Sequence, residues 1–470
     1  MSNRRDFLKA GAAVAAGGLV AGGLSAPAEA AEFGTYSRWK ASHGGPPDSP
    51  EYMGKMVPGF RKPSLPPVPV QTPDTKKLPW TMETGRKTFR LSCEVVKQEF
   101  LPGAEMNVWG FNGSMPGPVI EVNQGDKVRI IVTNNLPEPT SVHWHGLEIV
   151  ADMDGVPGMT QDLIPPGGQY VYEFDLHQAG SFFYHSHIAM QEAMGMVGWL
   201  IIHPAKAYTP TVDRDFALIF QNFFIEPSSM TPDSRRMDWN WHTINGRSGP
   251  LTTPLVVKHG ERVRVRLLDF SPMQHHPIHL HGHTYWLTGT EAGRIPSSAW
   301  IPRNTTLVGV AMVNDFEFVA NNPGDWIFHC HMVHHMMNHM TYPAGPGMRA
   351  SQSVEEYQAA IPDSVDQSLL IRGKETEDAN SVPAQLTPGY PQKMVGGMDM
   401  PPAVMKKITG RKEVAGMRKG WHMAVKGLMT AIRVLPHDLY DRVMSADPSI
   451  KPGEIFEETM QRVRKGRTGG

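Results

Sequence analysis

Short runs of hydrophobic residues, many of them alternating with polar residues, fill the middle of the chain from about residue 81 to residue 345. Turn-forming residues separate these runs, of which Phe89–Phe100, Val119–Thr133 and Tyr170–Leu176 are examples. A period of two is typical of β-strands that bury one face, so the pattern predicts an all-β fold. Residues 31–80 are rich in proline and glycine and predict an extended N-terminal arm.

An internal repeat divides this β-rich part into two copies of one β-sandwich. Three segments recur in the same order, and the offset between the copies drifts only from 135 to 144 residues. We therefore expect one domain over residues 81–205 and a second over residues 206–345. The matched segments are Val119–Arg129 with Leu255–Arg264, His143–Gly146 with His279–Gly282, and Gly180–His187 with Gly324–His331.

After residue 345 the strand pattern fades into a C-terminal tail, residues 346–470, which we expect to be partly helical. Apolar residues at helical spacing, with basic residues elsewhere on the wheel, predict one amphipathic helix between Gly420 and Leu435. Such a helix would pack onto the domain or onto a neighbouring subunit. The alternative is that it docks on a membrane surface or a redox partner.

The N-terminus and the overall charge indicate where the protein works and what it does not bind. Arg4 and Arg5 precede a Gly/Ala-rich apolar stretch and a small-residue cleavage pattern that ends at Ala30. This arrangement is typical of a twin-arginine signal peptide over residues 1–30, so we expect export to the periplasm or beyond. The chain has 45 Lys and Arg against 46 Asp and Glu, a balance that gives no basic surface for nucleic acid.

Candidate metal ligands are concentrated in four clusters that hold 14 of the 21 histidines. Within a strand, His-x-His spacing places two imidazoles on the same face, and each cluster contains such a pair. The pairs together supply eight imidazoles, which chance explains poorly. They are His143 with His145, His185 with His187, His279 with His281, and His329 with His331.

Cys330 lies between the last two of these histidines. If His329–His331 is extended, the thiol points to one face of the strand and the two imidazoles point to the other. A thiolate with two imidazoles and a weak axial methionine is the ligand set that favours one-electron copper chemistry. The pattern predicts one metal on the thiol side and further metals on the opposite side. The alternative is a disulfide between Cys93 and Cys330, which would leave the flanking histidines without a purpose.

Comparison of the two copies places the cysteine site in the second copy. Only that copy offers a thiolate with two further imidazoles, whereas both copies keep their His-x-His pairs. The corresponding positions are Thr140, Ser186 and Gln191 in the first copy and His276, Cys330 and His335 in the second.

These motifs resemble the multicopper oxidases over about residues 81–345, in the order in which that family carries them. The resemblance implies two cupredoxin-like Greek-key β-sandwich domains. It also implies four copper ions per subunit, namely one type 1, one type 2 and two type 3 ions. The implied ligands are His276, Cys330, His335 and axial Met340 for type 1; His143 and His279 for type 2; and His145, His185, His187, His281, His329 and His331 for the type 3 pair.

Only 88 residues separate His187 from His276, which leaves no room for a middle domain. The chain thus resembles the two-domain, laccase-like subgroup with its type 1 copper in domain 2. This resemblance implies a ring-shaped homotrimer in which domain 1 of one subunit and domain 2 of the next complete each trinuclear copper site. A copper nitrite reductase, also trimeric and two-domain, is disfavoured because it would need far fewer histidines and a type 1 site in domain 1.

The implied function is laccase-like oxidation of phenols or aromatic amines, coupled to reduction of O2 to water. We expect electrons to arrive through an exposed His335, with neighbouring His334 as a rival ligand. Asp154 is the candidate proton donor, although a turn-forming Asp-Gly is the alternative. A metal oxidase acting on Cu(I) or Mn(II) is the alternative function, which the 29 methionines keep open. A copper carrier without turnover would not need eight further imidazoles.

Overall fold

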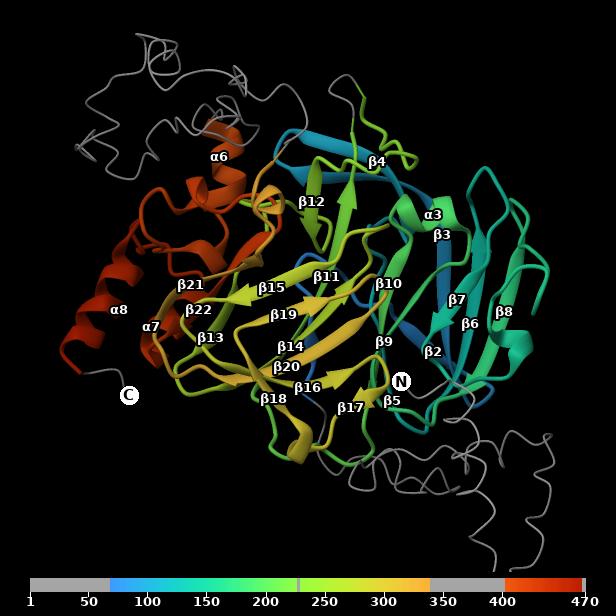
Figure 1. Cartoon of the computed structure of the whole chain (residues 1–470), viewed down its shortest axis with the longest axis horizontal. Helices are drawn as coiled ribbons and strands as arrows, with labels where there is room; N and C mark the ends of the chain where they lie inside the picture. The colour runs from blue at the N-terminus through green and yellow to red at the C-terminus, as the bar shows by residue number, and fades with distance from the viewer. Residues whose placement is uncertain (1–67, 226–228, 339–401, 467–470) are drawn as a thin grey trace, which may run out of the picture. The chain divides into compact units, whose positions relative to one another are not determined.

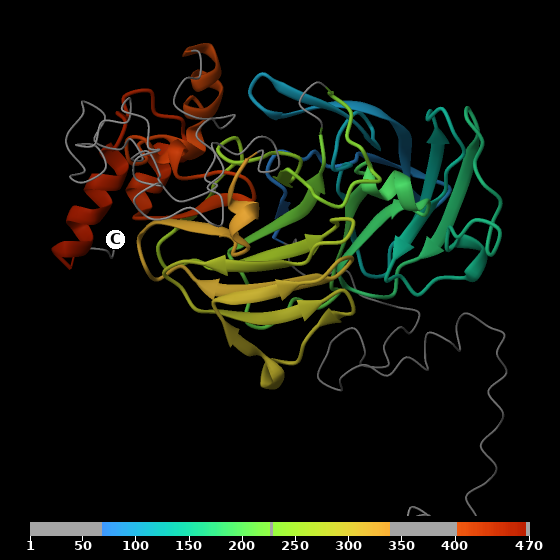
Figure 2. The same ribbon diagram turned by 45° about the horizontal axis from the view of Figure 1, so that its top comes forward.

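Strands dominate the computed structural model, which describes residues 68–225, 229–338 and 402–466. Within these ranges the strands form four sheets, which pack as two β-sandwiches (Figures 1 and 2). The all-β prediction is therefore confirmed. None of the helices in the described ranges is long and apolar enough to cross a membrane.

The first sandwich encloses a core that includes Phe89, Ile130, Trp144 and Tyr184. One sheet has the order β2-β3-β6-β8 with β4 paired to β3, and the other has the order β5-β10-β9-β7. Alternate side chains of β6 are buried, as the period-two pattern predicts. The strands are β2 (Trp80–Glu83), β3 (Arg86–Leu101), β4 (Ala104–Phe111), β5 (Ile120–Asn123), β6 (Lys127–Asn134), β7 (Val142–His145), β8 (Gln169–Asp175), β9 (Gly180–Ser186) and β10 (Val197–His203).

The second sandwich encloses a core that includes Leu267, Phe316, Cys330 and Ile432. One sheet has the order β1-β11-β14-β20-β16-β17 with β12 and β18 at its sides, and the other has the order β13-β22-β21-β15-β19. The strands are β1 (Val70–Gln71), β11 (Arg214–Phe223), β12 (Trp241–Ile244), β13 (Leu255–Lys258), β14 (Arg262–Asp269), β15 (His276–Leu280), β16 (Tyr285–Thr290), β17 (Gly293–Arg294), β18 (Ile301–Arg303), β19 (Thr305–Val308), β20 (Val313–Val319), β21 (Gly324–Cys330) and β22 (Met429–Leu435).

The two sandwiches share one pattern of strand pairing. Strand β5 is parallel to β10 as β13 is to β22, and β3 is parallel to β6 as β11 is to β14. The turns also match, because Gly125 and Gly260 have φ angles of +89° and +90°, a region in which other residues are strained. The structure thus confirms the internal repeat.

Strand β22 corrects the expectation of an amphipathic helix over residues 420–435. It pairs with β13 on one side and β21 on the other (Figure 1), in the place that β10 has in the first sandwich. Every side chain of β22 is buried, so its apolar residues serve a strand covered on both faces rather than one face of a helix. The second sandwich therefore takes its last strand from beyond the expected boundary at residue 345.

The remainder of the described tail is partly helical, as expected. Its helices are α6 (Pro402–Thr409), α7 (His437–Met444) and α8 (Glu454–Arg464). The end of the predicted N-terminal arm contributes β1, which lies parallel to β11, and the start of β2. Residues 1–67, which include the signal peptide and most of the arm, lie outside the described residues.

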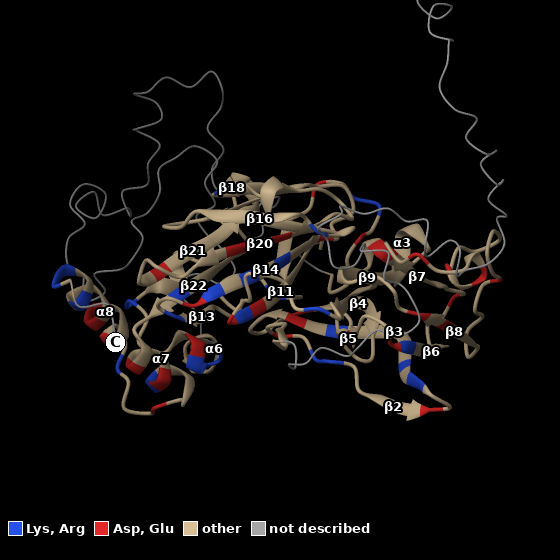
Figure 3. Cartoon of the chain, turned by 90° about the horizontal axis from the view of Figure 1, so that it is seen from below, with Lys and Arg blue, Asp and Glu red and all other residues tan. Residues whose placement is uncertain are grey.

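A buried ionic network lies where β9 of the first sandwich meets β14 and β20 of the second. Ser181 Oγ donates a hydrogen bond to Asp315 Oδ1 (2.8 Å) across this contact, and Arg266 pairs with Asp215 (2.8 Å). Figure 3 shows basic and acidic residues on β11, β14 and β20. Buried charges are tolerated when each has partners, and breaking such a network is costly. These contacts join the two copies through polar as well as apolar groups.

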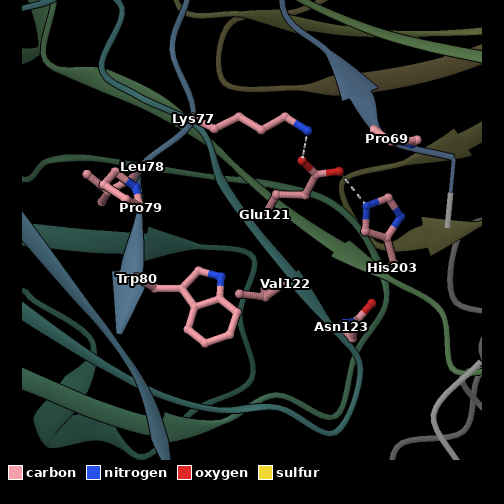
Figure 4. A pocket seen from close by; sticks show the side chains of 9 residues that line it. All are labelled: Pro69, Lys77, Leu78, Pro79, Trp80, Glu121, Val122, Asn123 and His203. Atoms are coloured by element: carbon pink, nitrogen blue, oxygen red, sulfur yellow. Dashed lines mark hydrogen bonds and ion pairs between the residues drawn. The ribbon is translucent and has the colours of Figure 1, made fainter. Parts of the chain in front are cut away.

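Glu121 connects the described end of the arm to the first sandwich (Figure 4). Its carboxylate pairs with Lys77 and accepts hydrogen bonds from His203 Nε2 (2.7 Å) and the Val70 N–H (3.0 Å). Glu121, Lys77 and His203 line an open cavity of about 590 Å³. Burial opposes ionisation of Glu121, but the hydrogen bonds from His203 and Lys77 outweigh it and lower its pKa from 4.5 to about 2.

We expect Glu121→Gln to destabilise the protein at neutral pH and to have a smaller effect in acid. A carboxyl whose pKa falls on folding stabilises the native state above its unfolded pKa of 4.5, and this contribution disappears as the pH falls toward 2. Denaturant titration should give a larger difference in unfolding free energy between wild type and variant at about pH 7 than at about pH 3. Equal differences at the two pH values would contradict the assignment.

Candidate metal centres

Cys330 ends strand β21 with its side chain in the core of the second sandwich, next to His276 and His335. Its Sγ lies 3.4 Å from His335 Nδ1, which lies 3.1 Å from His276 Nδ1. Ligand atoms about 2 Å from one metal ion lie roughly 3–4 Å from each other, so this donor set fits a single ion. Cys93 and Cys330 are both free thiols, so the alternative of a disulfide is wrong.

Hydrogen bonding orients the imidazole of His276 in this set, the cysteine set, and burial controls the protonation of the thiol. Ser271 Oγ lies 2.7 Å from His276 Nε2, which leaves Nδ1 free to act as a ligand. Burial raises the pKa of the Cys330 thiol to about 12, so the thiol is protonated until a metal displaces the proton. The carboxyl of Asp269, 3.6 Å from His276 Nε2, has a raised pKa because it is buried.

The imidazoles of the second sandwich lie on the opposite side of β21 and β15. His281 Nε2 is 3.2 Å from His329 Nε2, and the ring centroids of His279 and His331 are 5.7 Å apart. The prediction that Cys330 faces away from its two neighbours is therefore confirmed. Burial lowers the pKa of His329 to about 4, which keeps its imidazole neutral and able to bind a metal.

The first sandwich gathers the corresponding imidazoles on β7 and β9. His143 lies 5.3–5.6 Å from the three other rings between centroids, and His145 Nδ1 lies 3.4 Å from His185 Nε2. Burial lowers the pKa of His145 to about 4 and that of His185 to about 3. The set consists of His143, His145, His185 and His187.

Equivalent histidines in the two imidazole sets make equivalent hydrogen bonds. His143 Nδ1 donates to the Asp154 carbonyl and His279 Nδ1 donates to the Asn304 carbonyl, each at 2.7 Å. A carbonyl oxygen can only accept, so the proton is on Nδ1 and the Nε2 lone pair is free. In the same way, His185 donates to Ser186 O (2.7 Å) and His329 donates to Cys330 O (2.8 Å).

Each sandwich therefore presents its own set of four imidazoles. Ring contacts connect the histidines within each set, and across the described residues no ring contact joins one set to the other. The resemblance to the two-domain subgroup implied this separation, whereas the repeat alone is compatible with two sets that face each other or point apart.

The first sandwich replaces the cysteine set with a hydrogen-bonded polar cluster. Thr140 Oγ1 and Ser186 Oγ both donate to Gln191 Oε1, at 2.6 and 2.8 Å, and all three residues are buried. The structure thus brings together the three residues that the repeat aligned with His276, Cys330 and His335. Met196, aligned with Met340, is buried too, whereas Met340 and His339 lie outside the described residues.

The expectation of an exposed His335 is wrong, because its exposed fraction is only 2%. The ring is covered by His242 of β12, whose centroid is 4.2 Å away. His334, the rival ligand, is exposed and does not belong to the cysteine set.

Asp154 lies beside the imidazole set of the first sandwich. Its carbonyl accepts the His143 hydrogen bond, and its Oδ1 lies 3.4 Å from His143 Nδ1. Among the histidines without an expected ligand role, His275 accepts a hydrogen bond from Val310 N–H (3.0 Å) and His283 packs on Trp326.

The turn before β22 holds the loop of the cysteine set, although no sequence motif indicated this role. Leu428 N–H donates to His335 O (2.8 Å), and Cys330 N–H donates to Leu428 O (3.1 Å). Gly427 N–H donates to Asn338 Oδ1 (2.9 Å). A Cβ atom on Gly427 would lie only 2.2 Å from His335 O, so this close approach requires glycine.

Two multicopper oxidase family models match the chain, one over residues 93–207 and the other over residues 225–344, together half of its length. The chain belongs to the multicopper oxidase family. A twin-arginine translocation signal matches residues 1–21, so this multicopper oxidase is exported by the twin-arginine route to the periplasm or beyond.

Several relatives of this multicopper oxidase share part of its sequence. It is 36% identical over 137 residues to a copper resistance protein A homolog of Pseudomonas syringae pv. tomato, covering 29% of this chain and 23% of that protein. It is 50% identical over 123 residues to laccase-2 of Cryptococcus neoformans var. grubii, covering 26% of this chain and 20% of that protein. The matches thus span about a fifth of these relatives' lengths.

Solved structures resemble the multicopper oxidase over about half of the chain. The blue copper oxidase from Nitrosomonas europaea is 31% identical with a TM-score of 0.50, covering 54% of this chain and 81% of that chain. The multicopper oxidase mgLAC is 32% identical with a TM-score of 0.50, covering 55% and 83%.

We expect Gly427→Ala to disrupt the cysteine set. An alanine here would meet the His335 carbonyl and would hold φ at +57°, a conformation that costs a non-glycine residue about 1–2 kcal/mol. The blue absorption of the copper-loaded protein should weaken and its thermal midpoint should fall. The matched control is Gly103→Ala, which has φ +78° but nothing within 4 Å. Equal effects of the two substitutions on the blue absorption would contradict this role for Gly427.

Proposed function

We propose that this multicopper oxidase is a laccase-like enzyme that couples one-electron oxidation of phenols or aromatic amines to reduction of O2 to water. The observation that carries the proposal is the division of strand β21, with Cys330 beside His276 and His335 in the core and His329 beside His281 on the opposite side. Copper at the cysteine set would supply one-electron exchange, and copper held by the imidazoles would supply O2 reduction. Both functions depend on one short piece of chain.

The residues around Cys330 provide the connection that this coupling needs. Cys330 is joined by peptide bonds to His329 and His331, each a proposed ligand of the imidazole side. The hydrogen bond from His329 Nδ1 to Cys330 O (2.8 Å) adds a second, shorter connection. Electrons delivered at the sulfur would therefore reach the imidazole side without leaving the strand.

Oxidation of Cu(I) is a second candidate function, favoured by a cavity of about 500 Å³. Met190, Met237 and Met273 line this cavity, and each is more than half exposed. Ser271, which contacts His276, lines it as well. Thioether sulfur suits Cu(I), and a matched relative from Escherichia coli is named copper resistance protein A.

Oxygen consumption with different reductants tests the proposal. A phenol, an aromatic amine, Cu(I) and Mn(II) should be compared at one pH with the copper-loaded protein. Rapid O2 uptake with the phenol or the amine supports the laccase-like activity. Uptake with Cu(I) alone, abolished by Met237→Leu with Met273→Leu, would instead support the metal oxidase. No uptake with any reductant would contradict both.

We infer that two subunits complete each O2 site, because each sandwich presents only half of the imidazoles. A head-to-tail contact between the first sandwich of one subunit and the second of the next would close as a ring. The homotrimer implied by the two-domain subgroup is such a ring. The separation of the two imidazole sets within one chain supports this inference.

Mixed subunits test the shared site. His145→Ala and His329→Ala should each abolish O2 reduction in homogeneous assemblies. Dissociation, mixing and reassembly should restore activity, because some interfaces then pair an intact first sandwich with an intact second one. Lack of recovery, with mixed assemblies verified by mass spectrometry, would rule out sites shared between subunits.

We also propose that Asp154 delivers protons during O2 reduction. Asp154→Asn keeps the backbone carbonyl that holds His143, so copper content should not change. Loss of a positioned acid lowers rates by about a hundredfold or more. Turnover under saturating O2 should fall by that order, and its pH profile should change. If the variant keeps the wild-type turnover and pH profile, Asp154 does not deliver protons and serves only as a turn residue.

A further inference from the structure

His242, on strand β12, lies against the cysteine set although no motif marks it. Its exposed fraction is 1%, and its ring stacks on that of His335 with centroids 4.2 Å apart and an interplanar angle of 28°. The sequence predicted an exposed His335, and this contact covers its ring instead. His242 is thus the aromatic group that covers a proposed copper ligand.

Hydrogen bonds fix the orientation of the His242 ring. Its Nδ1 donates to Asn222 Oδ1 (2.9 Å), and Asn222 lies directly opposite on β11. Asn222 in turn donates through Nδ2 to Gln274 Oε1. Gln274 lies two residues before His276 in the chain, so the network that holds His242 ends on the segment that leads into the other imidazole of the cysteine set.

At this buried position, a histidine is less favourable in free energy than an apolar ring of similar size. With Nδ1 protonated, Nε2 carries a lone pair, and Nε2 is buried with no hydrogen-bond partner among the described residues. Leaving a buried polar atom unpaired is unfavourable, and an apolar ring would fill the same space without that cost. Filling the space beside His335 therefore does not by itself explain why this side chain is an imidazole.

The first sandwich offers an internal comparison. Strands β4 and β12 both run into an Asn-Gly turn, at Asn112 and Asn245, and both asparagines have φ +49°. Three residues before these asparagines, the first sandwich has Trp109 and the second has His242. The sandwich without a cysteine set has an indole at the position, and the sandwich with that set has an imidazole.

We infer that His242 is a positioning residue of the proposed type 1 copper site, an inference that rests on the proposed function. Its stacked ring restricts rotation of His335 about the Cβ–Cγ bond and so fixes the direction of Nδ1. The π face of a neutral ring also attracts positive charge. The copper site with its thiolate is more positive when oxidised, so the stacked ring and the polar side chain favour the oxidised state.

Reduction potential and electron paramagnetic resonance of the copper-loaded full-length protein test this role. His242→Leu removes the ring and most of the local polarity, whereas His242→Phe keeps a ring for stacking. In His242→Leu we expect the ratio of reduced to oxidised type 1 copper at a fixed potential to rise about two- to tenfold. A tenfold change corresponds to about 59 mV for a one-electron couple. The resonance lines should broaden as His335 gains freedom, and His242→Phe should stay closer to the wild type.

His203→Leu is the matched control, because His203 is also a buried histidine but contacts none of the proposed copper ligands. It should lower stability and leave the type 1 potential and spectrum unchanged. Should His242→Leu fail to fold, Asn222→Ala leaves the His242 ring but removes its anchor, and must shift the potential in the same direction by less.

An unchanged potential in the folded variants would overturn the inference, as would equal shifts in His242→Leu and His242→Phe. Absence of a type 1 signal in the copper-loaded wild type would instead overturn the proposed function and, with it, this inference. A wild-type signal with no response to substitution at His242 separates the two failures.

Discussion

The alternation of side chains along one strand is the constraint on which the rest of the structure depends. A β-strand sends neighbouring side chains to opposite faces, so Cys330 cannot share a face with His329. The thiol consequently belongs to the core of the second sandwich, and the imidazole lies on the opposite side of the strand beside His281. The core therefore also holds the imidazoles of His276 and His335. On the opposite side, His329 lies beside an imidazole from another part of the chain, that of His281. In the core, the ring of His276 is hydrogen-bonded to Ser271. On the opposite side, the ring of His279 from β15 is hydrogen-bonded to Asn304.

The two copies show that the scaffold does not require the metal. In the first sandwich, Thr140, Ser186 and Gln191 fill the place of the cysteine set with hydrogen bonds. Strands β5, β10 and β9 pair in the first sandwich as β13, β22 and β21 pair in the second. A sandwich of this kind is therefore stable with a polar cluster at this position. The copper chemistry of the multicopper oxidase depends on which side chains occupy that cluster, and the fold supplies only their positions.

Sequence patterns predicted the parts of the structure that are local. His-x-His spacing, alternation and the repeat were sufficient for the two sandwiches, the direction of Cys330 and the two imidazole sets. Strand β22 was not predicted, because it lies about a hundred residues after β21 and still further after β13, and its apolar spacing also suits a helix. The repeat could have predicted this strand. In the first sandwich β10 follows soon after Ser186, and a second copy of the same fold needs an equivalent strand. The covering of His335 by His242 and the hydrogen bond to Leu428 are tertiary contacts without any motif.

The central claim is that Cys330 creates one metal site in the core while the imidazoles hold the others independently. Copper analysis and electron paramagnetic resonance of Cys330→Ser test it most directly, because Ser186 shows that serine fits the equivalent place in the first sandwich. The wild type should bind about four copper ions per subunit, and the variant should bind about three and lack the type 1 signal. A variant that keeps the type 1 signal, or that loses all of its copper while remaining folded, would contradict the account.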